Sequence, residues 1–388
     1  MKATKIKENI YWVGAVDWNV RNFHGYLTQR GTTYNAYLII DKKITLIDTV
    51  KPIYAGEMIK RISSIIEPSK IDYIVSNHVE MDHSGALPSI MEVAKNAQII
   101  ASPKGVKGLK SHYGDFWNYK AVNTGDSINT GELNMSFILT PMVHWPDNMI
   151  TYVPEEKLLF SNDGLGQHLA SSERFDDEFP LDIIMEEAKK YYANIVLPYS
   201  RQVKKELEII SGLDLNMIAP SHGIIWRSNI NKILDGYKKW STNNTKEKAI
   251  IIYDTMWGST EIMANAIKEV FDDNGIHTSM RNLENHHMSD IMTELIDAKY
   301  ICVGSPTLNS TMMPSVAGFL TYMSGLAPIG RKALSFGSYG WGGKTVDDIN
   351  KYFEKSGFDI ILSKKIKYIP DNNDLDTLKS ELNDTILK

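Results

Sequence analysis

The chain contains a single cysteine, Cys302, among its 388 residues. One thiol excludes an intramolecular disulfide, and it excludes zinc and iron–sulfur sites that need several thiolates from one chain. Cys302 lies in the apolar run 300–304, which predicts a strand. We therefore expect the thiol to be a small buried hydrophobe.

Long apolar runs and an excess of positive charge are also missing. No run approaches the roughly 18 apolar residues of a membrane-spanning helix, and residues 1–11 lack the apolar stretch of a signal peptide. A net charge of −5 gives no electrostatic reason to bind nucleic acid or an anionic membrane. These features predict a cytoplasmic protein with neither kind of partner.

The length predicts two domains, because 388 residues exceed one ordinary domain. The apolar pattern lapses into polar, turn-prone residues over 240–248, and a new strand pattern begins at Ala249. We place the boundary near residue 247, which gives domains 1–247 and 248–388.

The first domain shows strand runs in pairs, with helical patterns between them. Runs 36–41 and 44–48, and likewise 149–153 and 157–160, are separated by short turns typical of hairpins. Helical patterns cover 54–66 and 181–193. Such a mixture predicts two sheets covered by helices.

The second domain alternates strands and helices. Strands are predicted at 249–255, 278–283, 300–305, 332–337 and 360–368, and helices at 260–271, 314–323 and 345–355. This alternation predicts a doubly wound parallel sheet, in which ligands bind at the carboxyl ends of the strands.

The most informative segment is 78–83, where His78, Glu80, Asp82 and His83 supply four metal-ligating side chains within six residues. One ion could not use all four, so the segment suggests two metals. If the extended geometry of the strand at 71–75 continues, His78 and Glu80 project to the same side.

Three further candidates, His144, Asp163 and His222, follow later apolar runs, where strands give way to loops. A lone histidine or aspartate in such a place is more often a turn residue than a ligand. Seven ligand-type residues together favour a dimetal site.

Three loops at strand ends of the second domain suit a flavin. The first comprises Thr255, Met256, Trp257, Gly258, Ser259 and Thr260. Its hydroxyls and the start of a helix form a phosphate nest. The lysine of a nucleotide triphosphate loop and the glycine-rich dinucleotide motif are both missing here.

The second loop contains Pro306, Thr307, Leu308 and Asn309, and the third contains Ser338, Tyr339, Gly340, Trp341, Gly342 and Gly343. Glycines let backbone N–H groups approach a ring, and aromatic side chains offer it a face. The third loop alone is more often a glycine-rich turn. The three loops together predict flavin mononucleotide (FMN).

The metal motif and the flavin loops resemble those of the flavodiiron proteins, and the resemblance covers essentially the whole chain. It implies a metallo-β-lactamase-like αββα sandwich followed by a flavodoxin-like domain, in the short form without a fused rubredoxin. The related metallo-β-lactamase hydrolases carry histidine where Glu80 stands and bind zinc. A carboxylate makes the site harder, which favours iron.

By this resemblance, one iron is held by His78, Glu80 and His144, the other by Asp82, His83 and His222, and Asp163 bridges them. The segment 17–26 is similar to the family's segment that places a histidine over the substrate pocket, here His24. His168 is a weaker candidate for a supporting role.

The expected function is reductive scavenging of a diatomic gas: reduction of O2 to water, of NO to N2O, or of both, at a non-haem diiron site fed by FMN. Two alternatives stay open. One is a zinc-dependent hydrolase fused to a flavodoxin domain, and the other is a non-catalytic electron carrier.

The resemblance also implies partners. We expect an external electron donor, either rubredoxin or a reduced flavin-type donor, because this chain has no fused donor module. We also expect a head-to-tail homodimer, or a dimer of such dimers, in which each flavin faces the partner's irons.

Overall fold

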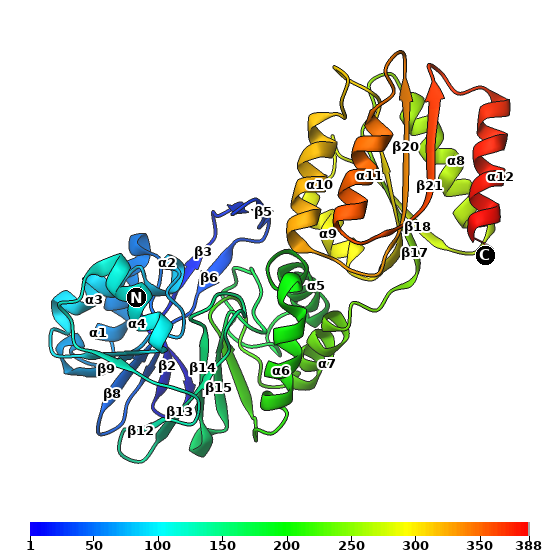
Figure 1. Cartoon of the computed structure of the whole chain (residues 1–388). Coiled ribbons are helices and arrows are strands. Elements are labelled where there is room, and N and C mark those ends of the chain that lie inside the picture. The colour runs from blue at the N-terminus through cyan, green and yellow to red at the C-terminus, as the bar shows by residue number, and fades with distance from the viewer. Residues whose placement is uncertain (387–388) are drawn as a thin grey trace. The chain divides into compact units, whose positions relative to one another are not determined.

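The computed structural model describes residues 1–386, which divide into two compact units (Figure 1). The first unit comprises Met1–His24, Thr28–Tyr191 and Tyr199–Lys238, and the second comprises Gly25–Leu27, Tyr192–Pro198 and the described residues from Lys239 onward. The predicted boundary near residue 247 lies close to the last of these divisions, and it stays a prediction.

The first unit is built on two sheets. The larger contains, in spatial order, β1 (Thr4–Lys7), β2 (Ile10–Trp12), β7 (Tyr37–Ile39), β8 (Ile44–Ile47), β9 (Ile71–Val75), β10 (Gln98–Ala101) and β11 (Tyr119–Ala121). The smaller contains β12 (Ser127–Asn129), β13 (Asn134–Leu139), β14 (Met149–Val153), β15 (Leu158–Asn162) and β16 (Met217–Pro220). Short strands β3 (Ala15–Asp17) and β6 (Thr32–Tyr34) pair with each other, and β4 is Asn22–Phe23.

The helices of this unit are α1 (Ala55–Ser63), α2 (Met81–Ser84), α3 (Leu87–Val93), α4 (Pro103–Tyr113), α5 (Leu181–Tyr191), α6 (Ser200–Ile210) and α7 (Ile230–Ser241). Single 3-10 turns of this unit are η1 (Pro52–Tyr54), η2 (Pro68–Lys70) and η3 (Pro154–Glu156), and a further 3-10 turn, η5 (Leu197–Tyr199), begins in the second unit and ends at Tyr199 of the first. Figure 1 shows α1, α3 and α4 beside the larger sheet and α5 to α7 beside the smaller one.

Period-two alternation along the strands creates two apolar layers. Leu38, Leu46 and Ile74 pack with residues of α1, α3 and α4. The alternate positions Tyr37, Ile47 and Val75 pack instead against the smaller sheet, where they meet Phe137 and Phe160. The predicted αββα sandwich is confirmed.

Both predicted hairpins are confirmed. Strand β7 pairs antiparallel with β8, and β14 pairs antiparallel with β15 across the 3-10 turn η3. Helix α1 is shorter than the predicted 54–66, since it ends at Ser63 ahead of Pro68, which disfavours helical geometry in the residue before it. Helix α5 ends at Tyr191 instead of 193, where a π-helical turn, η4 (Tyr192–Val196), follows.

The second unit contains one parallel sheet. In spatial order its strands are β18 (His277–Asn282), β17 (Lys246–Tyr253), β19 (Ala298–Gly304), β20 (Lys332–Tyr339) and β21 (Asp359–Lys367). Its helices are α8 (Ser259–Asp273), α9 (Met288–Leu295), α10 (Pro314–Leu326), α11 (Thr345–Lys355) and α12 (Asn372–Ile386), and the short strand β5 is Tyr26–Leu27.

This strand order is that of a doubly wound flavodoxin-like sheet, so the fold predicted for this half is confirmed. Helices α8 and α12 cover one face through Ile267 and Leu378, which pack with Ile251 and the buried Cys302. Helices α9 and α12 were not predicted. Strands β17, β19 and β20 are neighbours, so the loops that follow them share one edge of the sheet.

Candidate dimetal centre and flavin loops

The segment 78–83 lies in a loop and one turn of helix. Strand β9 ends at Val75, Glu80 precedes the short helix α2, and α2 carries Asp82 and His83. The extended strand expected to reach Glu80 therefore stops earlier, because the chain turns into α2. His78 and Glu80 nevertheless meet, with Nε2 of the first 3.3 Å from Oε2 of the second.

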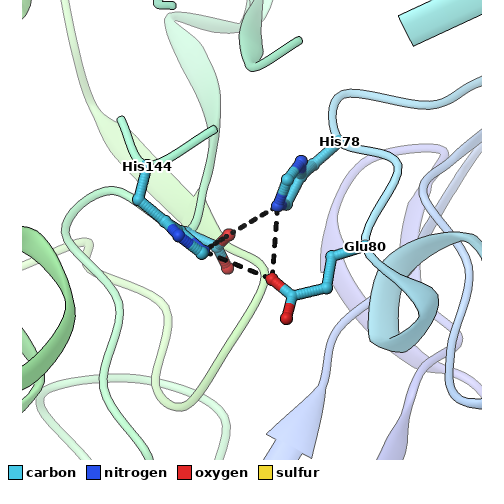
Figure 2. Close-up of side chains that lie close together, drawn as sticks. His78, Glu80 and His144 are labelled. Carbon is cyan, nitrogen blue, oxygen red and sulfur yellow. Dashed lines mark ion pairs between the residues drawn. The ribbon is translucent and has the colours of Figure 1, made fainter. Parts of the chain in front are cut away.

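His78, Glu80, His144 and Asp163 form the first ligand group. Figure 2 shows the side chains of His78, Glu80 and His144 pointing toward one another. The Nε2 atom of His144 lies 3.3 Å from Glu80 Oε2 and 3.3 Å from Asp163 Oδ2. The Nε2 atom of His78 lies 3.8 Å from the same Asp163 oxygen.

Asp82, His83 and His222 form the second group. The Nε2 atom of His222 lies 3.2 Å from Asp82 Oδ2, and that of His83 lies 3.4 Å from Asp82 Oδ1. Both rings face Oδ1 of Asp163, at 3.0 Å from His83 and 3.4 Å from His222. The two oxygens of Asp163 therefore face different groups, which is the arrangement of a bridging carboxylate.

These separations suit metal ligation. Two donor atoms that each lie about 2.1 Å from one metal, at an angle of about 90–110°, are about 3.0–3.4 Å apart. Within residues 1–386, Nε2 of His78 and His83 and both carboxylate oxygens of Asp82 and Asp163 are buried without a hydrogen-bond partner. Buried polar atoms are rarely left unpaired, so atoms that converge at these distances fit a pair of metal ions.

The charges of the centre support the same interpretation. Burial alone would lower the pKa of His78, but its contacts with Asp147 and Glu80 raise it to about 9. Burial would also lower the pKa of His83, but Asp82 and Asp163 raise it to about 9. At His144, the lowering by burial is outweighed by Asp163 and Glu80, which raise the pKa to about 10. The histidines hold the pKa of Asp163 well below its ordinary value despite its burial.

Without metal, these histidines stabilise the fold in their protonated form. Because their pKa values in the folded state are raised, this contribution is complete below about pH 6.5 and is lost as the pH rises through about 9 to 10. The carboxylates have lowered pKa values, so their contribution is present above about pH 4 and is lost on acidification.

Metal binding at pH 7 is therefore expected to release protons. Metal ions bind neutral imidazole, whereas the raised pKa values of His78, His83 and His144 favour their protonated forms at pH 7. We expect about three protons to leave when two ions bind, measured by calorimetry in buffers of different ionisation enthalpy. Binding without proton release would contradict the charge state described above.

Several residues that orient the ligands were not predicted. Asp147 accepts hydrogen bonds from His78 Nδ1 at 3.0 Å and from the Val79 backbone N–H at 2.8 Å. Asp48 accepts two from Asn77, which precedes His78. The Thr33 carbonyl accepts one from His222 Nδ1 at 2.6 Å. Such partners set the orientation of a ligating imidazole.

His24 and His168 both lie beside ligands of this centre, but in different surroundings. His24 is three-quarters exposed, and its Nε2 lies 3.3 Å from Glu80 Oε1, the oxygen that does not face the other histidines. His168 is buried, contacts Thr32 Oγ1 through Nδ1 at 2.8 Å, and lies 4.8 Å from the His222 ring, centroid to centroid. His168 thus packs behind a ligand, whereas His24 stands at the solvent side.

The first two predicted flavin loops follow β17 and β19, and the third begins with Ser338 and Tyr339, the last two residues of β20, at the same edge of the sheet. The backbone N–H of Asp254 donates to Gly304 O at 3.2 Å, and the N–H of Thr307 donates to Ser338 O at 2.9 Å. Ser315 Oγ donates to Asp254 Oδ2. These bonds tie each loop to its neighbour.

The first loop also fits a phosphate. Helix α8 begins at Ser259 after Gly258, whose φ of 86° suits glycine, and its N-terminus has no side-chain cap. Within the described residues the buried Thr260 hydroxyl has no hydrogen-bond partner. Trp257 and Trp341 are 93% and 81% exposed. Uncapped N–H groups, a free hydroxyl and unpacked aromatic faces are what the phosphate and ring of FMN require.

Two family models match the chain. The model described as "ODP family beta lactamase" matches residues 32–223, which include all seven candidate metal ligands. The model described as "Flavodoxin" matches residues 251–381, which include the three flavin loops. Within the described residues, no helix has the length and apolarity needed to cross a membrane.

Similar proteins span nearly the whole chain. A nitric oxide reductase of Moorella thermoacetica is 44% identical over 95% of this chain and 94% of its own length. The structure of rubredoxin oxygen:oxidoreductase from Desulfovibrio gigas matches with a TM-score of 0.97 and 40% identity, over 99% of this chain and 98% of the other. The flavodiiron protein from Giardia intestinalis matches with a TM-score of 0.96 and 34% identity, over 99% and 96%. Because this chain shares both domains, in the same order, with these proteins, it belongs to the flavodiiron proteins.

Proposed function

We propose that this chain reduces a diatomic gas, O2 to water, NO to N2O, or both, at a diiron centre supplied with electrons by FMN. The observation that carries the proposal is the placement of Asp163, whose two oxygens face two separate ligand groups. The relatives of this chain include proteins named nitric oxide reductase and rubredoxin-oxygen oxidoreductase.

We assign His78, Glu80 and His144 to one iron and Asp82, His83 and His222 to the other, with Asp163 between them. Each group then offers two imidazoles with carboxylate, a donor set that suits iron. The reduced flavin and two ferrous ions supply four electrons when bound, which is the number that reduction of O2 to water needs.

The side chains around the irons have separate tasks in this proposal. Asp147 holds the His78 ring by its Nδ1 and so fixes which nitrogen faces the metal. Trp145 packs edge-on against His78, with centroids 5.0 Å apart, and limits water on that side. His24 can donate a hydrogen bond or a proton from Nε2 beside Glu80, which is the role predicted for it.

A zinc hydrolase is not favoured. Such a hydrolase would leave the flavin domain without a task, and Glu80 stands where the hydrolases carry histidine. A non-catalytic electron carrier would need neither of the ligand groups. Its electron transfer would continue at the normal rate after chelation, whereas the proposed reductase would stop.

FMN is assigned to the three loops of the second unit, with its phosphate at the start of α8. Replacing Thr260 with valine keeps the side-chain shape and removes the hydroxyl. We expect the Kd for FMN to rise about 10–100-fold, because a hydrogen bond to a charged group contributes about 1.5–3 kcal/mol. Riboflavin, which lacks the phosphate, serves as the control ligand and should bind the variant and the wild type equally. Equal losses for both ligands would contradict the placement of the phosphate.

Three further features remain proposals. Residues 1–247 form the diiron domain and 248–388 the FMN domain of a cytoplasmic protein. An external donor, rubredoxin or a reduced flavin-type donor, supplies the electrons. The active form is a head-to-tail homodimer, or a dimer of dimers. Sedimentation that finds only the 43.9 kDa monomer, in protein that shows full activity, would contradict this assembly.

The test of the function is gas consumption by the iron- and FMN-loaded protein. Reduced rubredoxin drives the reaction, and O2 and NO are offered separately to a gas electrode. Consumption of at least one gas that stops after chelation is the expected result. Turnover of an ester or thioester by a zinc-loaded protein, with no gas consumed, would overturn the proposal.

A further inference from the structure

We infer that Asn35 is a positioning residue for the second metal site, because it fixes the loop 220–223 that carries His222. This inference rests on the proposed function, in which His222 is a ligand. Asn35 lies just after β6, and its side chain is fully buried. A buried amide in an otherwise apolar run, Tyr34–Tyr37, needs a structural reason.

The side-chain amide of Asn35 donates both of its N–H bonds to this loop. Nδ2 donates to Pro220 O at 2.8 Å and to Gly223 O at 3.0 Å, the residues on either side of Ser221 and His222. The backbone N–H of Asn35 donates to Ser221 O at 2.8 Å. One residue thus binds three of the loop's carbonyls.

Trp12 fixes the orientation of the amide. Its Nε1 donates to Asn35 Oδ1 at 2.8 Å, and an indole N–H can only donate. Oδ1 must therefore face Trp12, which leaves both N–H bonds of Nδ2 for Pro220 and Gly223. Trp12 is buried, and the guanidinium groups of Arg61 and Arg174 lie 4.8 and 4.5 Å from its ring centroid, so it has little freedom to move.

Residues on either side of Asn35 hold the same loop. Thr33 accepts from Gly223 N through its hydroxyl and from His222 Nδ1 through its carbonyl, both at 2.6 Å. Tyr37 donates its hydroxyl to Pro220 O at 2.6 Å. The alternate residues 33, 35 and 37 share one face of the extended chain, and together they fix the loop from which the His222 ring projects.

The first metal group is held by other means. His78 is oriented by Asp147, and within residues 1–386 the side chains of residues 33, 35 and 37 form no hydrogen bond with His78, Glu80 or His144. Loss of the Asn35 amide should therefore weaken the site of Asp82, His83 and His222 far more than the other. Partners behind a metal ligand typically change metal affinity about 10–100-fold.

The experiment compares Asn35→Ala and Tyr37→Phe with Tyr152→Phe as the matched control. Tyr152 also donates its hydroxyl to a carbonyl, Asp214 O, at 2.8 Å, but Asp214 precedes β16, whereas the loop 220–223 follows the other end of that strand. The FMN-containing protein is stripped of iron and titrated with Co²⁺, followed by absorption and by metal analysis after dialysis. Thermal unfolding of the metal-free proteins reports any general loss of stability.

We expect the wild type and Tyr152→Phe to bind two Co²⁺ per chain. In Asn35→Ala one of the two binding steps should weaken about 10–100-fold while the other stays within about twofold, and Tyr37→Phe should show a smaller change of the same kind. If Asn35→Ala does not fold, the comparison of Co²⁺ binding by Tyr37→Phe and by Tyr152→Phe tests the inference.

Two results would overturn the inference in distinguishable ways. A wild type that binds fewer than two Co²⁺ would overturn the proposed function and, with it, the role of Asn35. A wild type that binds two, with variants that lose neither step or lose both equally, would overturn the role of Asn35 alone.

Discussion

Replacing Asp163 with asparagine is expected to abolish gas reduction while flavin reduction by the donor continues. Among residues 1–386, Asp163 is the one whose side chain faces both ligand groups. An amide of the same shape loses the charge, and its nitrogen cannot bind a metal. Since even partners behind the ligands contribute about 10–100-fold, we expect activity to fall at least about 100-fold and both ions to be lost on dialysis.

The control is the same chemical change at Asp177, which is partly exposed and forms an ion pair with Arg227. Asp177→Asn should keep its iron and its activity. An Asp163→Asn protein with two tightly bound irons and normal gas consumption would contradict the bridging assignment.

Glu80→His is expected to change which metal the protein holds. The substitution exchanges a hard carboxylate for the imidazole that the zinc hydrolases carry at this place, so zinc should displace iron when both are supplied. Zinc has no redox chemistry, so gas reduction should fall in proportion to the iron lost, with FMN content unchanged. Metal analysis and a gas electrode measure the two effects on the same sample.

Glu80→Asp is the matched variant, since it keeps the carboxylate on a shorter side chain. We expect it to retain a preference for iron and part of the activity. If Glu80→His held iron as well as the wild type does, the carboxylate at this position would not be what selects the metal.

The meeting of His144, Asp163 and His222 could be predicted from their positions after apolar runs. Strands β15 and β16 are parallel neighbours that end at Asn162 and Pro220, just before Asp163 and His222. Because the carboxyl ends of parallel strands meet at one edge, residues far apart in sequence converge there. The flavin loops lie at the carboxyl ends of β17, β19 and β20 for the same reason.

The residues behind the ligands could not be predicted in the same way. Asp147 acts from a loop with no pattern of its own, and Thr33 acts through a backbone carbonyl that every residue has. Asn35 did leave a signal, a polar amide within the otherwise apolar run 34–37, but the loop that its side chain binds is nearly 190 residues away. Sequence spacing reports local periodicity, whereas such contacts depend on how two sheets pack.

Helices α9 and α12 were missed for a different reason. Helix α12 buries only Leu378 and Leu382 along 15 residues, so its apolar stripe is narrow and most of its side chains are polar. Helix α9 spans eight residues, of which Ser289 is one of those buried. Short or weakly amphipathic helices owe their stability to tertiary packing, which the sequence pattern does not display.

The central claim is that one chain stores electrons on a flavin and on two metal ions. Anaerobic titration with dithionite of protein that contains two irons and one FMN tests it most directly, with electron uptake counted per chain. The account predicts an uptake of four electrons, two by the flavin and two by the irons, and the full reoxidation of this protein by O2 or NO. An uptake of two electrons, confined to the flavin in protein shown to contain both irons, would contradict it.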